Sequence, residues 1–263
     1  MAQHSTDIEP TISIQELGPH EATIDWNGCF TLDGAARFSK ILDNLFGYYL
    51  YRSVTVNLES PGGQVVGLDY MLRAVDSWKR KGRNLAVRST FECASAAALF
   101  LSYGKWGSRT VDKQTNLVFH GARFDPRSFS EFSAISSSLA SRHMSEMDNR
   151  IVEHLTTSLT TSAGSAEALR SLLFDRIQYV ASNWEEIVYS MSSLTFHDEN
   201  TRKPKWIKSI QKVGSTSDPK AFLPAYIGYL SRRFQSDSRM DLREAYSLCL
   251  IDEVGDVPLV VEG

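Results

Sequence analysis

Residues 54–78 read VTVNLESPGGQVVGLDYMLRAVDSW, and this stretch decides the fold class. Residues 54–58 are rich in β-branched side chains and predict a strand, which the segment Ser60-Pro61-Gly62-Gly63 ends. From Val65 onward, apolar residues recur every three or four positions and predict a helix over 64–81. A strand followed at once by a helix is the repeating unit of a parallel α/β sheet.

The same alternation continues on both sides of this stretch. The other predicted strands and helices that precede position 120 are strands at 11–14 and 22–26, a helix at 33–50, a strand at 85–88, a helix at 94–103 and a strand at 117–119. This order predicts an α/β fold with a largely parallel sheet and right-handed crossovers.

The second half of the chain is predicted to be mainly helical. A long helical pattern runs from Asp125 to about Thr160, and helices are also expected at 166–189 and 221–234. The segment 197–220 is polar, which predicts an excursion or a mobile loop. A last strand or turn is predicted at 250–254. We therefore expect one domain over residues 11–263, with a flexible N-terminus at 1–10 and an extra helical and loop insertion at about 160–235.

Composition excludes several classes of protein. The chain has 263 residues, of which 42% are hydrophobic and 22% charged, as expected for a globular protein. Its 28 Lys and Arg against 31 Asp and Glu give a net charge of −3, which does not favour a nucleic-acid partner. No apolar run approaches the ~20 residues of a membrane helix, and no secretory signal is apparent. Three scattered cysteines predict reduced thiols in a cytoplasmic protein, without a metal or cofactor site.

Three segments whose residues could take part in catalysis follow predicted strands. They are Glu59–Gly63, Cys93–Ala97 and Val118–His120. Because the carboxyl ends of parallel strands meet at one edge of a sheet, we expect the three segments to lie close together.

Together, these segments hold the parts of an acyl-transfer site. Ser95 would be the nucleophile and His120 its general base, while the backbone N–H groups of Gly63 and Ala96 would stabilise the oxyanion. Taken singly, each has a simpler interpretation. Ser95 is a good helix N-cap, a lone histidine is often structural, and Gly62-Gly63 is a plausible turn.

These residues resemble the proteolytic subunit of the Clp protease, within the ClpP/crotonase-like superfamily. The resemblance rests on Ser60-Pro61-Gly62-Gly63, Cys93-Ala94-Ser95-Ala96 and Phe119-His120, and it covers roughly residues 20–160 and 237–254. It implies a repeated β-β-α superhelix with a long handle-like helix over 129–160. It also implies a serine endopeptidase with Ser95 and His120 as catalytic residues and Gly63 and Ala96 as the oxyanion hole.

The resemblance also implies partners. The substrate would be a polypeptide, no cofactor would be needed, and the chain would form a homo-oligomer. Since the sequence contains no nucleotide-binding GxxxxGK[ST] motif, degradation of folded proteins would need a separate ATP-dependent unfoldase.

The chain departs from the family pattern in two respects. Cys93 precedes Ala94, and Glu92 stands two positions before it, where the family usually has glycine; the interval between His120 and the closing segment 240–252 is also much longer. The third triad residue is consequently open. Asp237 is the first candidate and Asp175 is its rival. A further alternative is that neither residue has this role.

Two other functions compete with the peptidase. One is a catalytically inactive ring component or binding module of the same fold. The other is a crotonase-like enzyme acting on an acyl-CoA, which also uses paired backbone N–H groups but has no need of a Ser95–His120 pair.

Overall fold

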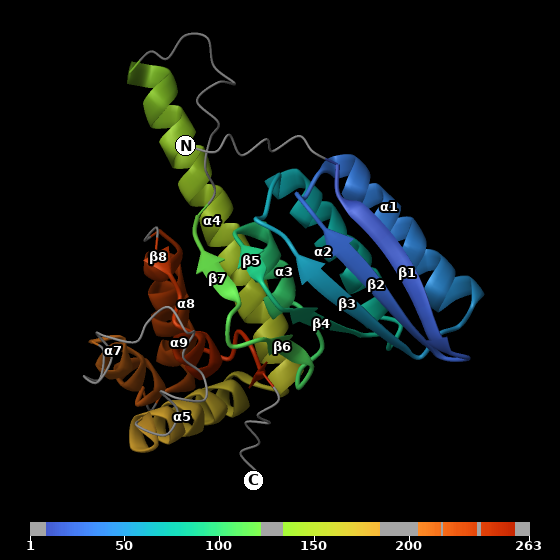
Figure 1. The fold of residues 1–263 in the computed structure, drawn as a ribbon. Coiled ribbons are helices and arrows are strands. Elements are labelled where there is room, and N and C mark those ends of the chain that lie inside the picture. Colours follow the sequence, from blue (N-terminus) through green and yellow to red (C-terminus); the bar gives the residue numbers. More distant parts are fainter. Residues whose placement is uncertain (1–8, 122–133, 185–204, 217, 236–237, 256–263) are drawn as a thin grey trace.

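The computed structural model describes residues 9–121, 134–184, 205–216, 218–235 and 238–255. They form a mixed α/β structure with two sheets (Figure 1). The larger sheet has the strand order β1-β2-β3-β4-β6-β9, and all of its neighbouring strands are parallel except the hairpin β1/β2. Its strands are β1 Thr11–Gly18, β2 Glu21–Asn27, β3 Ser53–Glu59, β4 Leu85–Ser89, β6 Arg109–Val111 and β9 Glu253–Val254.

A smaller sheet stands at the end of the larger one and carries the residues of interest. Its strands are β5 Glu92–Ala94, β7 Asn116–Phe119 and β8 Ser238–Arg239, in the order β5-β7-β8. The β5/β7 pair is parallel and the β7/β8 pair antiparallel, with Phe119 opposite Ser238. The end of β7, just before His120, therefore lies beside a segment from near the C-terminus.

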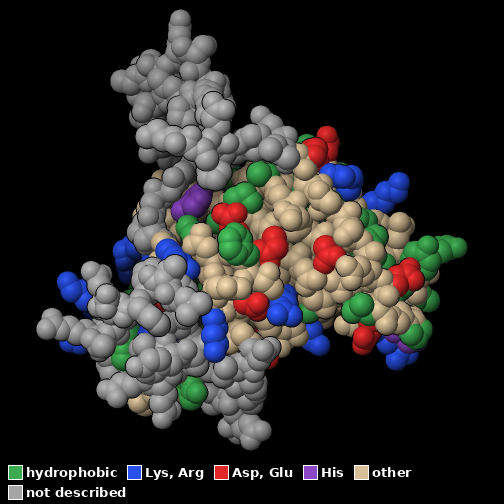
Figure 2. Space-filling model, in the orientation of Figure 1, with side chains coloured by type: hydrophobic (Ala, Val, Ile, Leu, Met, Phe, Trp, Pro, Cys, Tyr) green, Lys and Arg blue, Asp and Glu red, His purple; other side chains and the backbone are tan. Residues whose placement is uncertain are grey.

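The core fills the space between the large sheet and its helices. Helices α1 Leu32–Leu42 and α2 Val65–Lys79 lie side by side on one face of the sheet, and α3 Ala96–Ser102 packs against α2 (Figure 1). On β3, Val54, Val56 and Leu58 are buried beneath these helices, whereas the alternate residues are partly exposed. This two-residue alternation is that of a sheet covered on one face. On the face visible in Figure 2, acidic and basic side chains are mixed.

The second half of the described chain is helical. Its helices are α4 Ala134–Ala163, α5 Ala166–Ser182, α7 Lys205–Gly214, α8 Pro219–Gln235 and α9 Leu242–Ser247. In Figure 1, α4 runs past α3, and α5, α7, α8 and α9 gather at the end of the molecule away from β1. None of the described helices combines the length and the apolar character that a membrane span requires.

The structure corrects the predicted elements in three places. The segment 197–220 was predicted as an excursion or loop, but α7 and the start of α8 are helical, because Ile207, Ile210 and Val213 share one buried face. The helix predicted over 33–50 changes at Asp43 into the π-helical turn η1 Asp43–Tyr48. Ala94, predicted to begin a helix, instead ends strand β5. Residues 125–133 and 185–189, also predicted as helical, lie outside the described residues.

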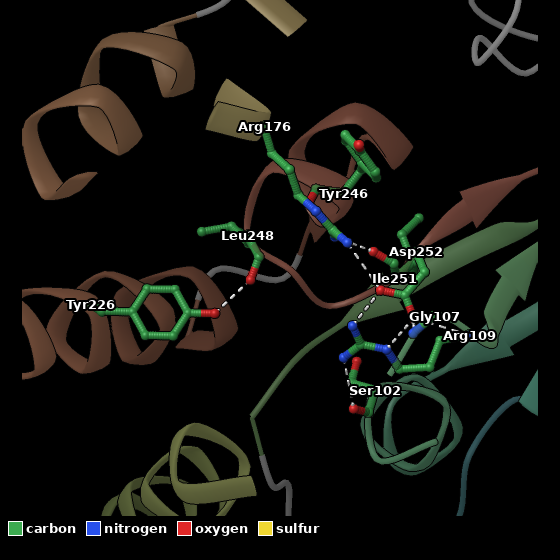
Figure 3. Close-up of polar contacts among 9 residues, drawn as sticks. All are labelled: Ser102, Gly107, Arg109, Arg176, Tyr226, Tyr246, Leu248, Ile251 and Asp252. Carbon is green, nitrogen blue, oxygen red and sulfur yellow. Dashed lines mark hydrogen bonds and ion pairs between the residues drawn. The ribbon is translucent and has the colours of Figure 1, made fainter. Parts of the chain in front are cut away.

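A buried ion network joins the C-terminal end of the chain to the sheet (Figure 3). The Asp252 carboxylate accepts hydrogen bonds from Arg109 at 2.7 and 2.6 Å and from Arg176 at 3.1 Å, and all three side chains are under 10% exposed. Backbone N–H groups of Gly107 and Arg109 donate to the same carboxylate. Burial raises the pKa of Asp252, but its bonds to the two arginines outweigh burial and lower that pKa below its usual value.

Candidate active site

Ser95 sits on a strained turn between β5 and α3. Its backbone has φ 57° and ψ −122°, a conformation that residues other than glycine rarely adopt. Hydrogen bonds on both sides hold it there: Ser95 N–H donates to the Val118 carbonyl at 2.7 Å, and Ala94 N–H to the Ser60 carbonyl at 3.0 Å. The Ser95 hydroxyl does not cap the helix. Strain of this kind gathers at functional sites, and in enzymes of the α/β-hydrolase fold a strained strand-to-helix turn projects the nucleophilic serine outward.

Glu59 fixes the loop that leads to this turn. The loop 90–92 directs backbone N–H groups at the Glu59 carboxylate, and one hydroxyl joins them. The donors are Thr90 N (2.6 Å), Thr90 Oγ1 (2.6 Å), Phe91 N (3.0 Å) and Glu92 N (2.9 Å). Glu59, for which the sequence predicted no separate role, thus ties the end of β3 to the start of β5.

The two glycines after Ser60 are required by close backbone approach. The Ser60 hydroxyl accepts a hydrogen bond from Gly62 N–H at 3.0 Å. Gly62 has φ +99°, and a Cβ there would lie 2.6 Å from Cβ of Ser95. Gly63 has φ +144°, and a Cβ there would overlap the backbone of Phe30. Only glycine fits either position, so the Ser60–Gly63 segment is built to pass directly beside Ser95.

Two backbone N–H groups at the site are free. Among the described residues, neither Gly63 N–H nor Ala96 N–H has an acceptor. Ala96 is the first residue of α3, where N–H groups have no partner within the helix and the helix dipole favours negative charge. These are the two donors that the sequence predicted for an oxyanion hole.

His120 follows β7, and its ring is oriented by the backbone. Its Nδ1 lies 2.8 Å from the carbonyl oxygen of Gly121. Because a carbonyl only accepts hydrogen bonds, Nδ1 carries a proton, and in the neutral ring Nε2 then has the free lone pair. A neutral imidazole with a free Nε2 is the form that acts as a general base. The orienting group is therefore a carbonyl oxygen, where a carboxylate was expected.

Ser95 and His120 line one small cavity. Its volume is about 20 Å³, enough for one water molecule but not for a peptide. The wall combines the predicted site residues with apolar side chains and one carboxylate. The lining residues are Val65, Leu68, Ser95, Ala96, Leu99, His120, Asp148, Ile151 and Phe234.

Phe234 belongs to the extra helical region and lines this cavity. It lies near the end of α8, is buried, and stacks on Phe119 with ring centroids 5.1 Å apart and planes 7° apart. Its carbonyl oxygen accepts a hydrogen bond from Gly121 N–H at 2.6 Å. The region that lengthens the chain between His120 and the closing segment therefore reaches the Ser95–His120 pair itself.

The two acids that the sequence offered as the third triad residue differ in how far the structure supports them. Asp237 lies outside the described residues, but its neighbour Ser238 pairs with Phe119, the residue before His120. Asp175 is exposed on α5 and does not line the cavity. Asp237 therefore stays a prediction, and Asp175 has no geometric support.

Asp148 is the carboxylate that lines the cavity, and sequence reasoning missed it. It lies on α4, so close to Gly121 that a Cβ added to this glycine would overlap the carboxylate. The only available signal was the helical periodicity of α4, since Asp148 lies three residues before Ile151, an apolar member of that pattern.

The neighbouring cysteine is not a competing nucleophile. Cys93 is fully buried, and burial raises the pKa of its thiol far above the usual value. A buried neutral thiol is inert, because the thiolate is the reactive form. Among the described residues, no group of three or more His, Cys, Asp or Glu is placed to hold a metal ion.

Comparison with known proteins assigns no family. No protein-family model matches the chain, and no curated protein matches it.

Proposed function

We propose that the chain is a serine peptidase that resembles the proteolytic subunit of the Clp protease. The observation that carries the proposal is the strained Ser95 backbone, held beside His120 in one cavity with two free N–H groups nearby. A structural serine at a helix start would bond the helix with its hydroxyl, and Ser95 does not.

The proposed reaction follows from the roles of these groups. The Ser95 Oγ attacks the peptide carbonyl carbon as its proton passes to His120 Nε2. The N–H groups of Gly63 and Ala96 stabilise the oxygen of the tetrahedral intermediate. His120 then gives the proton to the leaving amine, and water activated by the same Nε2 hydrolyses the acyl-enzyme. The Gly121 carbonyl keeps the proton on Nδ1 through each step.

The charge that forms on His120 needs an acid nearby. Asp148 supports this role by its place in the cavity, and Asp237 by its position in the chain next to Ser238. We assign the role to Asp148, because a carboxylate in the cavity wall acts on the imidazolium through space even without a bond to Nδ1. By the same resemblance, we propose a ClpP-like fold, self-association into rings, and a separate unfoldase for folded substrates.

One observation favours the alternative of an inactive binding module. The cavity holds about 20 Å³, too little for a peptide, and Phe234 at the end of α8 forms part of its wall. A peptide reaches Ser95 only if this wall opens, and we propose that the end of α8 is the part that moves. An active enzyme therefore opens at this point, whereas an inactive relative has no need to.

A fluorophosphonate probe tests the proposal directly. We expect the wild-type protein to be labelled at Ser95, with the adduct located by mass spectrometry, and to hydrolyse short fluorogenic peptides. Ser95→Ala and His120→Ala should abolish both signals. His20→Ala is the matched control, because that side chain is exposed and distant in the fold from the cavity lining.

The alternatives give different results in the same experiment. Labelling at Ser95 without peptide hydrolysis would indicate another acyl substrate. An absence of labelling in every oligomeric fraction of the purified protein would contradict the peptidase and favour the binding module.

A further inference from the structure

A second, larger hollow lies on α4 away from the Ser95 cavity. It has a volume of about 690 Å³ and is bounded by the end of α2, the loop that follows α3 and the last turns of α4. A volume of this size holds a small organic molecule. The part of α4 that lines it starts at His154, three residues beyond the last α4 residue of the Ser95 cavity, Ile151.

The wall of this hollow is cationic and rich in hydroxyl groups. Lys79, Arg80 and Lys105 line it together with one carboxylate, that of Asp76, and Nε2 of His154 lies 3.1 Å from that carboxylate. Four hydroxyl-bearing residues of α4 complete the wall: Thr157, Ser158, Thr161 and Ser162. With its one carboxylate engaged by the histidine, the wall presents an excess of positive charge.

Lys79 is the central cation, and its hydrogen bonding is incomplete. Its Nζ donates to the Tyr103 carbonyl at 2.7 Å and to Ser158 Oγ at 3.3 Å. An ammonium group has three N–H donors, so one has no hydrogen-bond acceptor, and the same Nζ lies 5.0 Å from the centre of the Tyr103 ring. No carboxylate of the described residues lies within ion-pair distance of this Nζ. Burial lowers the pKa of Lys79 to about 8, and the Asp76 carboxylate, which lies beyond ion-pair distance, opposes this shift only in part.

The hydroxyl groups supply further donors. Ser158 Oγ accepts from Lys79, which leaves its own hydrogen free to donate. Within the described part of the chain, the hydroxyls of Thr161 and Ser162 donate to no protein acceptor. An ammonium group bonded to one hydroxyl, with exposed hydroxyls of Thr161 and Ser162 in the same wall, is suited to a ligand that offers several strong acceptors and a negative charge, which describes a phosphate group.

We propose that this hollow binds the phosphate group of a small organic phosphate, held by the free N–H of Lys79 and the hydroxyls of Ser158, Thr161 and Ser162. Arg80 and Lys105, which are exposed at the rim, add attraction at longer range. This site is independent of the proposed peptidase, because none of its lining residues belongs to the Ser95 cavity.

Isothermal titration with three probes tests the inference: inorganic phosphate, ribose 5-phosphate and adenosine 5′-monophosphate. We expect saturable binding of at least one organic phosphate with a Kd below about 1 mM. Lys79→Met should weaken it about tenfold or more, since the methionine keeps the alkyl chain and removes the charge-assisted bond. Lys81→Met is the matched control, because that ammonium lies over the Trp78 ring and does not line the hollow.

The three probes separate the possible sources of the phosphate. Tighter binding of the organic phosphates supports the proposal as stated, and equal binding of inorganic phosphate narrows the ligand to the free ion. No saturable binding of any probe up to about 10 mM, or an equal loss in the Lys79 and Lys81 variants, would overturn it. Circular dichroism and thermal melting of both variants show whether the fold is kept.

Discussion

The Arg109–Asp252–Arg176 network and the Ser95–His120 cavity are both polar groups set in an apolar surround, but they use their hydrogen bonds differently. In the network, the carboxylate accepts from both arginines and from two backbone N–H groups. At the cavity, the Ser95 hydroxyl caps no helix, and two backbone N–H groups have no acceptor among the residues that the structure describes. A saturated cluster stabilises a fold, whereas an unsaturated cluster on strained backbone is ready to bind a further group.

Breaking the network should have the largest effect, and it should fall on stability. Asp252→Asn removes the negative charge and leaves two buried arginines without their counter-ion, which costs about 3–5 kcal/mol of unfolding free energy. Urea denaturation followed by circular dichroism measures this loss. Asp112→Asn is the control, because its ion pair with Arg88 is exposed and is expected to contribute less than ~1 kcal/mol.

The same variant tests whether the two regions are separate. Molecules of Asp252→Asn that remain folded should react with the fluorophosphonate probe at the wild-type rate. A large drop in their Ser95 labelling would show that the network also positions the catalytic groups, and the two regions would then not differ in role.

A low pH should reduce the stability that the network contributes. The pKa of Asp252 is lower in the folded chain than its usual value of 3.8, so its stabilisation is fully present above 3.8. It is lost as the pH falls below 3.8 through the folded-state pKa. The stability difference between the wild type and Asp252→Asn should therefore narrow below about pH 4 and stay constant above about pH 5. A difference that is unchanged at about pH 3 would contradict the assignment.

Replacing the cavity acid should have a smaller effect, on reactivity alone. Because the Gly121 carbonyl already fixes the His120 tautomer, Asp148→Asn should remove only electrostatic support for the imidazolium, and labelling of Ser95 should slow about tenfold. Loss of an orienting aspartate in a complete triad costs about 10⁴. The labelling rate over about pH 5–9 measures the change.

Two further variants identify the acid. Asp175→Asn should label at the wild-type rate, since that side chain is exposed on α5. If Asp237→Asn slows labelling by about 10⁴ while Asp148→Asn does not, Asp237 is the triad acid and Asp148 does not support the imidazolium.

The sequence predicted most of the alternating strands and helices of the first half, although not β5 and β6, and it predicted that the segments of Ser95 and His120 lie close together, because local signals determine both. Strands that alternate with helices place strand ends at one edge, and Ser60–Gly63 and Ser95 stand at such ends. The network was not predicted, because Arg109 and Asp252 meet only through the β6/β9 pairing of very short strands. Asp148 was missed for the same reason, since its contact with Gly121 depends on how α4 crosses β7.

The helix α7 was missed for a different reason. Its segment is rich in lysine and serine, which favoured a loop, yet Ile207, Ile210 and Val213 recur at helical spacing. Counting the apolar positions, without weighing overall polarity, would have found it.

The smallest expected effect concerns the closure of the cavity by Phe234. Phe234→Leu keeps an apolar side chain but loses the ring stack on Phe119, which is worth about 1 kcal/mol. If the end of α8 must move before a ligand reaches Ser95, this loss favours the open form, and labelling by a bulky fluorophosphonate should accelerate roughly fivefold. Phe222→Leu is the matched control, because that ring lies on the same helix and stacks on Tyr226, outside the cavity lining. Equal acceleration in both variants would indicate general loosening of α8, and no acceleration in either would show that the stack does not limit access. A gain confined to Phe234→Leu would mean that the extra helical region gates an otherwise complete site.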